Sequence, residues 1–115
     1  MKTTEISKDD WAEFFDRVTE ALQGKRIDIE IDAPDIGAQV EARKLSLNGL
    51  GYDRKDDVFV IDTEVIEHLV RAPRQIFVSG DEDAVDSLEI TVADGGKHIV
   101  SFNEPLALPM PGSTA

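Results

Sequence analysis

The two histidines of this chain, His68 and His98, are the side chains best suited to proton transfer near neutral pH. Neither belongs to a zinc-protease motif or to a nucleophile elbow. The serines have no activating base nearby in the sequence, so no nucleophile is indicated. We interpret each histidine as a rim residue that a neighbour satisfies, with a general-base role as the alternative. The sequence therefore identifies no catalytic residue and leaves both histidines as candidate ligand contacts.

Two arginines three positions apart, Arg71 and Arg74, could bind an anion together with loop amides. The alternative is that they only offset the acidic surface. The other basic residues form adjacent pairs, and neighbours on a strand point to opposite faces, so these pairs make no patch by themselves. They are Lys25 with Arg26, Arg43 with Lys44, and Arg54 with Lys55. No glycine cluster forms a phosphate loop.

The sequence also predicts no metal and no cofactor. The run from Asp81 to Asp86 superficially resembles a calcium loop, but it lacks the central glycine and the glutamate at the twelfth position. The chain has no cysteine, which excludes thiolate zinc sites, thiol nucleophiles and disulfides.

The chain is strongly acidic, with 24 Asp and Glu against 12 Lys and Arg and a formal net charge of -12. This charge repels a phosphate backbone, so nucleic acid is not an expected partner. No apolar run approaches the roughly 20 residues that span a bilayer, and the first residues lack the apolar stretch of a secretion signal. We therefore expect a cytoplasmic protein without membrane contact. The acidic surface either keeps the protein soluble or docks on a basic protein.

One amphipathic helix is predicted over residues 8–23. Ser7 is a suitable N-cap, and Gly24 follows the last turn. Ile6 and Trp11 have the spacing of a hydrophobic staple. The apolar residues recur at helical period and predict one buried stripe, made of Trp11, Phe14, Phe15, Val18 and Leu22.

After this helix the pattern changes to the alternation of β-strands. The first strand alternates Ile27, Ile29 and Ile31 with acidic residues. The next strand changes parity between residues 40 and 47, which predicts a bulge or sharp bend near Arg43 and Lys44. The expectations that follow are turns at residues 48–51 and 53–57 and a central strand at 58–61.

The second half of the chain contains one ambiguous segment. Residues 63–71 fit a two-turn helix that Thr63 caps and Pro73 ends, and a strand is the alternative. A short strand at 75–79 and an acidic loop at 80–86 are expected next. The chain then forms a hairpin of residues 88–92 and 98–102. Its parity predicts a three-residue turn, Asp94 to Gly96, with Gly96 left-handed and Val92 opposite His98.

These elements define one α+β domain over residues 1–104. We expect the N-terminal helix to pack on a strongly bent, mainly antiparallel sheet or partly open small barrel of five to seven strands. From Pro105 to Ala115 the composition predicts a flexible tail. The arrangement is similar to that of small Sm-like barrels, many of which bind RNA or proteins, and the negative charge argues against RNA.

The chain also resembles a family of bacterial proteins, Domain of Unknown Function 5335. The resemblance rests on the helix, the segment from Asp32 to Ala42, the element from His68 to Pro73 and the closing turn Ala93-Asp94-Gly95. It implies no activity, cofactor or functional residue.

The leading functional hypothesis is a non-enzymatic module that binds a protein or a ligand, or that forms a homo-oligomer. The alternatives are a small hydrolase-like enzyme that uses a histidine and carboxylates, and an acidic inhibitor or mimic that docks on a basic partner. A cleft that joins a histidine to a carboxylate would favour the enzyme, whereas a broad apolar or acidic face would favour the other hypotheses.

Overall fold

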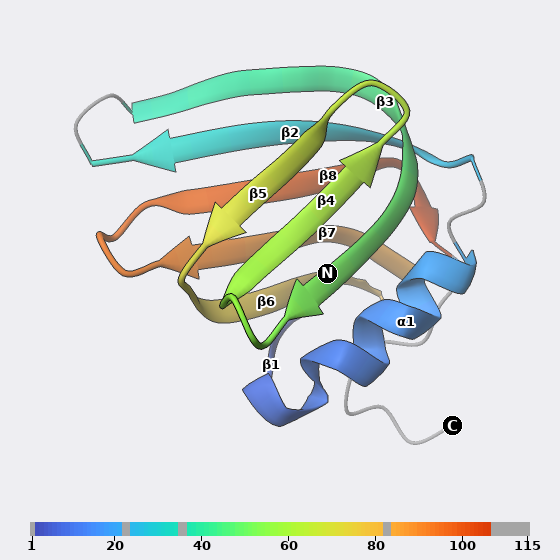
Figure 1. Cartoon of the computed structure of the whole chain (residues 1–115). Coiled ribbons are helices and arrows are strands. Elements are labelled where there is room, and N and C mark those ends of the chain that lie inside the picture. The colour runs from blue at the N-terminus through green and yellow to red at the C-terminus, as the bar shows by residue number, and fades with distance from the viewer. Residues whose placement is uncertain (1, 22–23, 35–36, 82–83, 107–115) are drawn as a thin grey trace.

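The computed structural model describes residues 2–21, 24–34, 37–81 and 84–106. They form one antiparallel sheet in the order β1-β6-β7-β8-β2-β3-β4-β5, with one α-helix (Figure 1). A short 3-10 helix, η1 (Lys8–Asp10), precedes helix α1 (Trp11–Ala21). The strands are β1 (Lys2–Ile6), β2 (Arg26–Ala33), β3 (Gly37–Asp53), β4 (Val58–Thr63), β5 (Glu67–Arg71), β6 (Pro73–Asp81), β7 (Ala84–Val92) and β8 (Lys97–Leu106). Neither described helix is long and apolar enough to cross a membrane.

The α+β class and the antiparallel sheet are confirmed, but the expected number of strands is wrong, because the sheet has eight. It does not close into a barrel, since β1 and β5 lie at its two ends and each pairs with one described strand. Strand β1 was not predicted. It pairs with β6 in an unbroken register from Lys2 opposite Gly80 to Ile6 opposite Ile76. Only Ile6 of β1 is buried, so the strand has no apolar alternation to reveal it.

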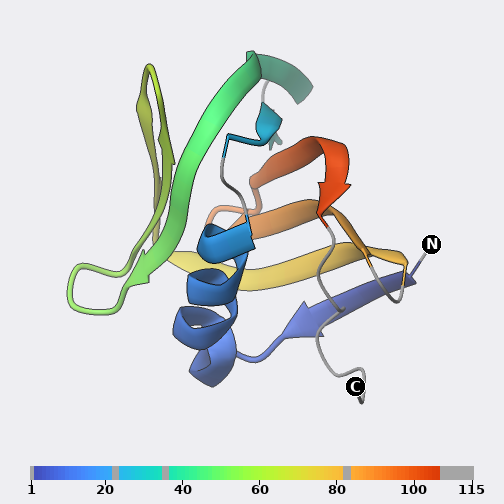
Figure 2. The same ribbon diagram turned by 90° about the vertical axis from the view of Figure 1, so that its right-hand side faces the viewer.

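Strand β3 bends sharply, as predicted, and thereby divides the sheet into two layers. Its first part pairs with β2 and its last part with β4. At the bend, Lys44 has a φ of +53° and its amide donates to Asp28 Oδ1 at 2.8 Å. The guanidinium of Arg26 donates to the Lys44 carbonyl at 3.0 Å. Beyond this point β3, β4 and β5 fold over the layer formed by β1, β6, β7, β8 and β2 (Figure 2).

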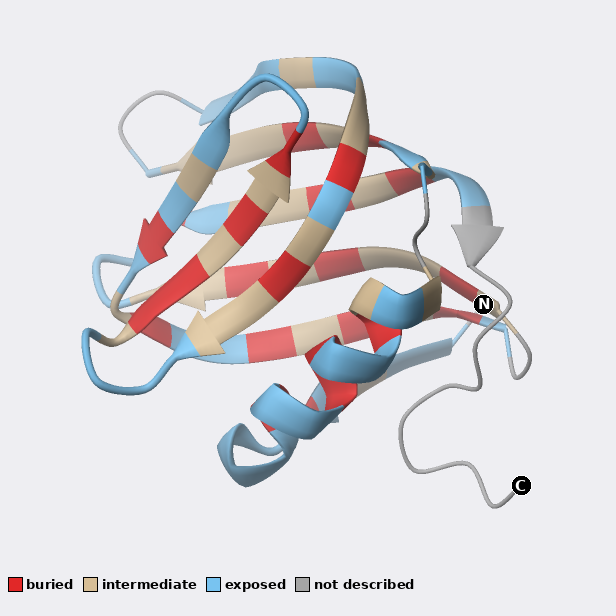
Figure 3. Ribbon diagram, turned by 45° about the vertical axis from the view of Figure 1, so that its right-hand side comes forward, coloured by how far each residue is buried: buried red, intermediate tan, exposed pale blue. Residues whose placement is uncertain are grey.

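Helix α1 lies between the two layers at one end of the molecule (Figure 2). Four residues of the predicted stripe are buried, namely Trp11, Phe14, Phe15 and Val18, and Leu22 lies outside the described residues. The ring of Phe15 packs edge-on against Phe59 of β4, with centroids 4.8 Å apart. The buried residues in Figure 3 therefore form one core that the helix and both layers share.

The start of the helix differs from the prediction. Residues 8–10 form the 3-10 helix; the Ser7 carbonyl accepts the Asp10 amide at 2.9 Å, but the Ser7 side chain makes no capping hydrogen bond. Ile6 and Trp11 are both buried, and the Trp11 indole donates to the Ile6 carbonyl at 2.9 Å. This bond fixes the angle at which β1 enters the helix.

Thr19 of the helix forms hydrogen bonds with the backbone at the edge of β3 beyond the bend. Its hydroxyl donates to the Leu50 carbonyl at 3.0 Å and accepts from the Leu50 amide at 3.1 Å. A Cβ on Gly49 would lie 3.3 Å from Thr19 Cγ2, so glycine permits this close approach. The turn predicted at 48–51 is therefore wrong: these residues continue β3, and Gly49 serves packing rather than chain reversal. The turn within residues 53–57 is present.

The helix predicted over residues 63–71 is also wrong. The Thr63 hydroxyl does accept the amides of Val65 and Ile66, at 3.3 and 3.0 Å, as an N-cap would. However, it also donates to the Ile66 carbonyl at 2.7 Å, and the Thr63 amide donates to the same oxygen at 2.9 Å. These bonds close a tight hairpin turn, so the chain returns along β4 as strand β5.

The final hairpin has the predicted three-residue turn, displaced by one position. The Val92 amide donates to the Gly96 carbonyl at 2.9 Å, and the left-handed residue is Gly95, with a φ of +91°, rather than Gly96. As a result His98 lies opposite Ile90 instead of Val92. The turn moves by one residue, and the partner of each residue on the opposite strand therefore changes by two. Because side chains alternate with a period of two, every side chain stays on its predicted face.

The remaining boundaries concern β6, β7 and the tail. The strand predicted at 75–79 lies within β6. The loop predicted at 80–86 is shorter, because β6 continues to Asp81 and β7 begins at Ala84, and residues 82–83 lie outside the described residues. Strand β8 reaches Leu106, and the rest of the predicted tail, 107–115, lies outside them as well.

Candidate functional site

The two candidate histidines meet across the gap between the layers. Nε2 of His68 on β5 lies 2.9 Å from Nδ1 of His98 on β8, and the ring centroids are 5.1 Å apart. His68 points inward because it lies on the same side of β5 as the buried Val70. His98 is flanked by Ile31 and Ile90 on the neighbouring strands. Both rings are half-buried, so the pair forms a polar margin of the core.

Burial lowers the pKa of both His68 and His98 below the ordinary value of 6.5, and the His68 charge lowers that of His98 further. Glu41 opposes the shift at both rings, and Asp94 opposes it at His98. Both imidazoles are therefore neutral at pH 7. In a neutral pair one ring nitrogen donates and the other accepts.

Carboxylates lie near this pair, because the charge of Glu41 acts on both rings and that of Asp94 on His98. Within residues 2–21, 24–34, 37–81 and 84–106, no three His, Asp or Glu side chains are placed to hold a metal ion. The ring nitrogens that face each other are engaged with each other rather than with a hydroxyl nucleophile. The pair joins the two layers at this end of the core.

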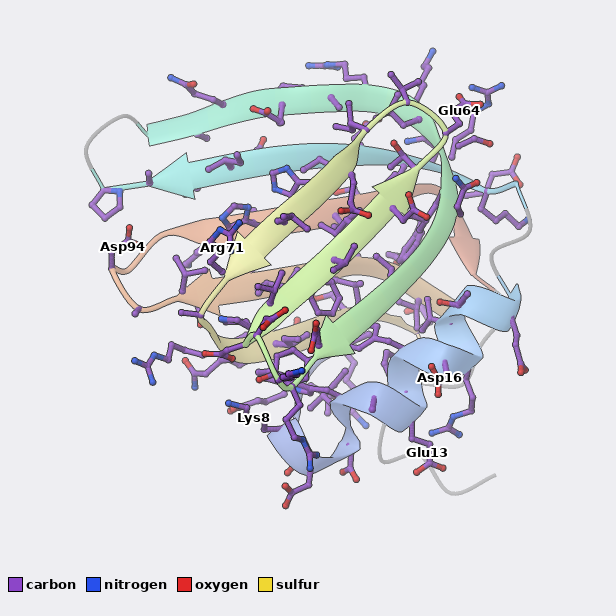
Figure 4. All side chains as sticks on the ribbon, viewed as in Figure 1. Lys8, Glu13, Asp16, Glu64, Arg71 and Asp94 are labelled. Atoms are coloured by element: carbon purple, nitrogen blue, oxygen red, sulfur yellow. The ribbon has the colours of Figure 1, made fainter. Side chains whose placement is uncertain are left out.

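The candidate arginines do not join the histidines in one site. Arg71 ends β5 on the face opposite to His68, and Arg74 lies near the start of β6. Between them the chain turns sharply at Ala72, with a φ of +53°. Both arginine side chains are exposed (Figure 4 labels Arg71).

A second cluster locks the start of the helix against β3. The Tyr52 hydroxyl donates to Asp57 Oδ1 at 2.6 Å, a bond that raises the pKa of Tyr52. Lys8 Nζ lies 3.9 Å from the same carboxylate and 5.6 Å from the ring centroids of both Trp11 and Tyr52. These contacts satisfy one another, so we assign the cluster a structural role.

The feature that the sequence did not reveal is the outer face of the five-stranded layer, the side that points away from β4 and β5. A row of residues crosses these five strands and the first part of β3, with each residue opposite the next. The row alternates acidic with apolar side chains. In order they are Glu5, Phe77, Glu89, Ile99, Glu30 and Val40. No described helix covers this face, because α1 lies between the layers (Figure 2).

Two further rows lie beside this one on the outer face. The first is rich in hydroxyls and consists of Thr3, Ser79, Ser87, Ser101 and Asp28. The second consists of Gln75, Thr91, Lys97, Asp32 and Ala38. The three rows together carry five carboxylates and one lysine, so the outer face is acidic.

A surface hollow of about 150 Å³ opens on the outer face between β8, β2 and β3. Its lining includes Glu30, Val40 and Ile99 of the alternating row, with Asp28, Ser101 and Arg43 around them. The hollow has room for one side chain of a partner, with two carboxylates and the Arg43 guanidinium beside an apolar floor. No local motif encodes it, because its residues come from three strands distant in the sequence.

The chain is a small antiparallel α+β domain with an acidic sheet face that no described helix covers. Residues 2–111 match the family of unknown function DUF5335, and the chain belongs to this family. It is similar to an uncharacterized protein of Aquifex aeolicus (strain VF5), with 33% identity over 110 residues, which cover 95% of this chain and 99% of that protein. No solved structure matches the chain.

Proposed function

We propose that this protein is a non-enzymatic binding module whose outer face docks on a basic surface of a partner protein. The alternating row supports this proposal most directly. It places Phe77 and Ile99 between carboxylates, and Val40 beside Glu30, on a sheet face that no described helix covers. A partner that presents Lys or Arg side chains around apolar ones would match this pattern.

The carboxylates of the row make only weak contacts: the Gln75 amide donates to Glu5 Oε2 at 3.4 Å, and Glu89 has one exposed ion pair. Lys97 Nζ lies 3.8 Å from Glu89 Oε1, but both side chains are well exposed, so this ion pair contributes little and a partner's cations can replace it. Val40 is 48% exposed, and covering it would remove apolar surface from water. Charge would guide the encounter, and apolar contact would add affinity.

The hydrolase-like alternative has less support. His68 and His98 bind each other at the margin of the core, and the outer face carries neither histidine. The acidic inhibitor or mimic is a special case of the proposed docking, in which the partner's own function is blocked.

The test compares the protein with a charge-reversed variant, Glu30→Lys/Glu89→Lys, as bait for native lysate, with captured proteins identified by mass spectrometry. A matched control, Glu13→Lys/Asp16→Lys, makes the same charge change on the exposed side of α1 (Figure 4). We expect basic proteins to bind the wild type and the control but not the outer-face variant. The bound proteins should elute at about 0.5 M salt, where exposed charges are screened.

A third variant, Phe77→Ser, reduces the apolar part of the outer face without changing its charge, and it should weaken the same captures. Circular dichroism checks that each variant is folded. The proposal is wrong if the outer-face variant captures the same proteins as the wild type, or if the helix control loses them equally.

A further inference from the structure

The free edge of β5 is the other unusual surface of the molecule. Four large hydrophobic residues of the described chain are strongly exposed, and three of them belong to the hairpin that ends in β5: Val65 at 70%, Ile66 at 36% and Leu69 at 38%. Strand β5 is the last strand of its layer, with β4 on one side and no described strand on the other (Figure 1). Val65 and Ile66 lie in the turn before β5 and Leu69 lies on β5 itself, so exposed apolar residues gather beside and on an open sheet edge.

This edge lacks two of the usual protections against strand pairing, a bulge and a proline, although β5 is short and exposes Glu67 and Arg71. Proteins block such edges with bulges, prolines or inward-pointing charges. The pairing of β5 with β4 is regular over five residue pairs, without a bulge, and β5 contains no proline. The other end strand, β1, differs, because all its exposed side chains are polar or charged, whereas β5 exposes Leu69 between Glu67 and Arg71. Of the two end strands, β5 is therefore the better candidate to pair with a further strand.

The sequence of β5 indicates which strand would pair with it. Glu67, Leu69 and Arg71 share the outer side of β5, whereas His68 and Val70 point to the core. If two copies pair antiparallel about Leu69, Glu67 of each copy lies opposite Arg71 of the other, and the two Leu69 side chains meet between these ion pairs. A two-fold contact requires such a self-complementary surface.

We propose that two copies of this chain associate through β5, in an antiparallel register centred on Leu69, which joins their sheets into one. The inference does not depend on the outer face, which belongs to the other layer. Five residues from each copy bury less than the roughly 1,200 Å² of a standard interface, so we expect a weak dimer.

The register gives a charge-swap test in the full-length protein. Glu67→Arg places arginine opposite arginine at both ends of the contact, and Arg71→Glu places glutamate opposite glutamate. We expect each single change to raise the dissociation constant by about tenfold or more. The double variant, Glu67→Arg/Arg71→Glu, restores opposite charges and should return the dissociation constant close to the wild-type value. Sedimentation equilibrium over a range of micromolar concentrations measures all four proteins.

Two further variants separate this contact from other modes of association. Leu69→Lys should leave the protein monomeric, whereas Arg74→Glu, an equal charge reversal on β6 outside the contact, should dimerise as the wild type does. A monomer at every concentration overturns the inference, as does a dimer that Leu69→Lys does not weaken. Failure of the double swap to restore a dimer lost in both single variants refutes the register.

Discussion

Replacing Thr19 by valine tests how helix α1 holds the bent part of β3. Valine has the shape of threonine, so the substitution removes the hydroxyl without opening a cavity. Both hydrogen bonds between that hydroxyl and the Leu50 backbone are then lost, and Leu50 is only 5% exposed. At about 1 kcal/mol for each bond, we expect a loss of about 2 kcal/mol in the free energy of unfolding. For a domain of this size that corresponds to a fall in Tm of roughly 6 to 12 °C.

Urea denaturation followed by tryptophan fluorescence measures this change, because the buried Trp11 is the only tryptophan of the chain. Thr19→Ser is the matched control: it keeps the hydroxyl and loses one methyl group, so it should cost about 1 kcal/mol or less. If Thr19→Val unfolds at the same urea concentration as the wild type, or if Thr19→Ser is the more damaging change, the hydroxyl does not stabilise the edge of β3.

Phe15→Ala should lower the free energy of unfolding by about 3 to 5 kcal/mol, measured by the same denaturation, because Phe15 is fully buried against Phe59; an unshifted midpoint would contradict the packing of α1. Burial lowers the pKa of His68 and His98 in the folded state, so around and below pH 6.5 the unfolded chain binds more protons than the folded protein. The free energy of unfolding should therefore fall as the pH drops from about 7 to 5. His68→Gln/His98→Gln should flatten this dependence, and equal slopes for both proteins would contradict it. With a net charge of -12, the protein should not bind generic DNA or RNA oligonucleotides at about 150 mM salt, and sub-micromolar binding by fluorescence anisotropy would refute that expectation.

Patterns carried by neighbouring residues predicted the local elements of this fold. The isoleucines of β2 alternate because one face is buried, and the change of parity in β3 marks the bend at Lys44. The apolar stripe of α1 has helical period because the helix contacts the core along one side. In each case the buried face and the chemical signal lie within one segment.

Predictions failed where the same residue type is common in two different backbone structures. Thr63 accepts amide hydrogens two and three positions ahead, as a helix cap does, and the same bonds close the hairpin before β5. Gly49 resembles a turn residue, but it provides room for Thr19. The adjacent glycines 95 and 96 left the left-handed position ambiguous by one residue, since either can adopt it.

The arrangement of the candidate sites could not be read from the sequence. The candidates His68 and His98 were named separately, and only the folding of β5 over β8 brings their nitrogens to 2.9 Å. The outer face is built by register across six strands, so its acidic and apolar residues come from both ends of the described chain. Local patterns contain no information on such pairing.

The position of β1 in the sheet affects how the protein emerges from the ribosome. The Thr3 hydroxyl contacts that of Ser79, 76 residues later in the sequence, so β1 has no partner until β6 has been made. At typical rates of synthesis this delay is roughly 4 to 15 s, a long time compared with the folding of a helix. During this interval β3 and β4, which cover the apolar side of α1, are already made, so β1 and not the helix is the element that waits for its partner strand.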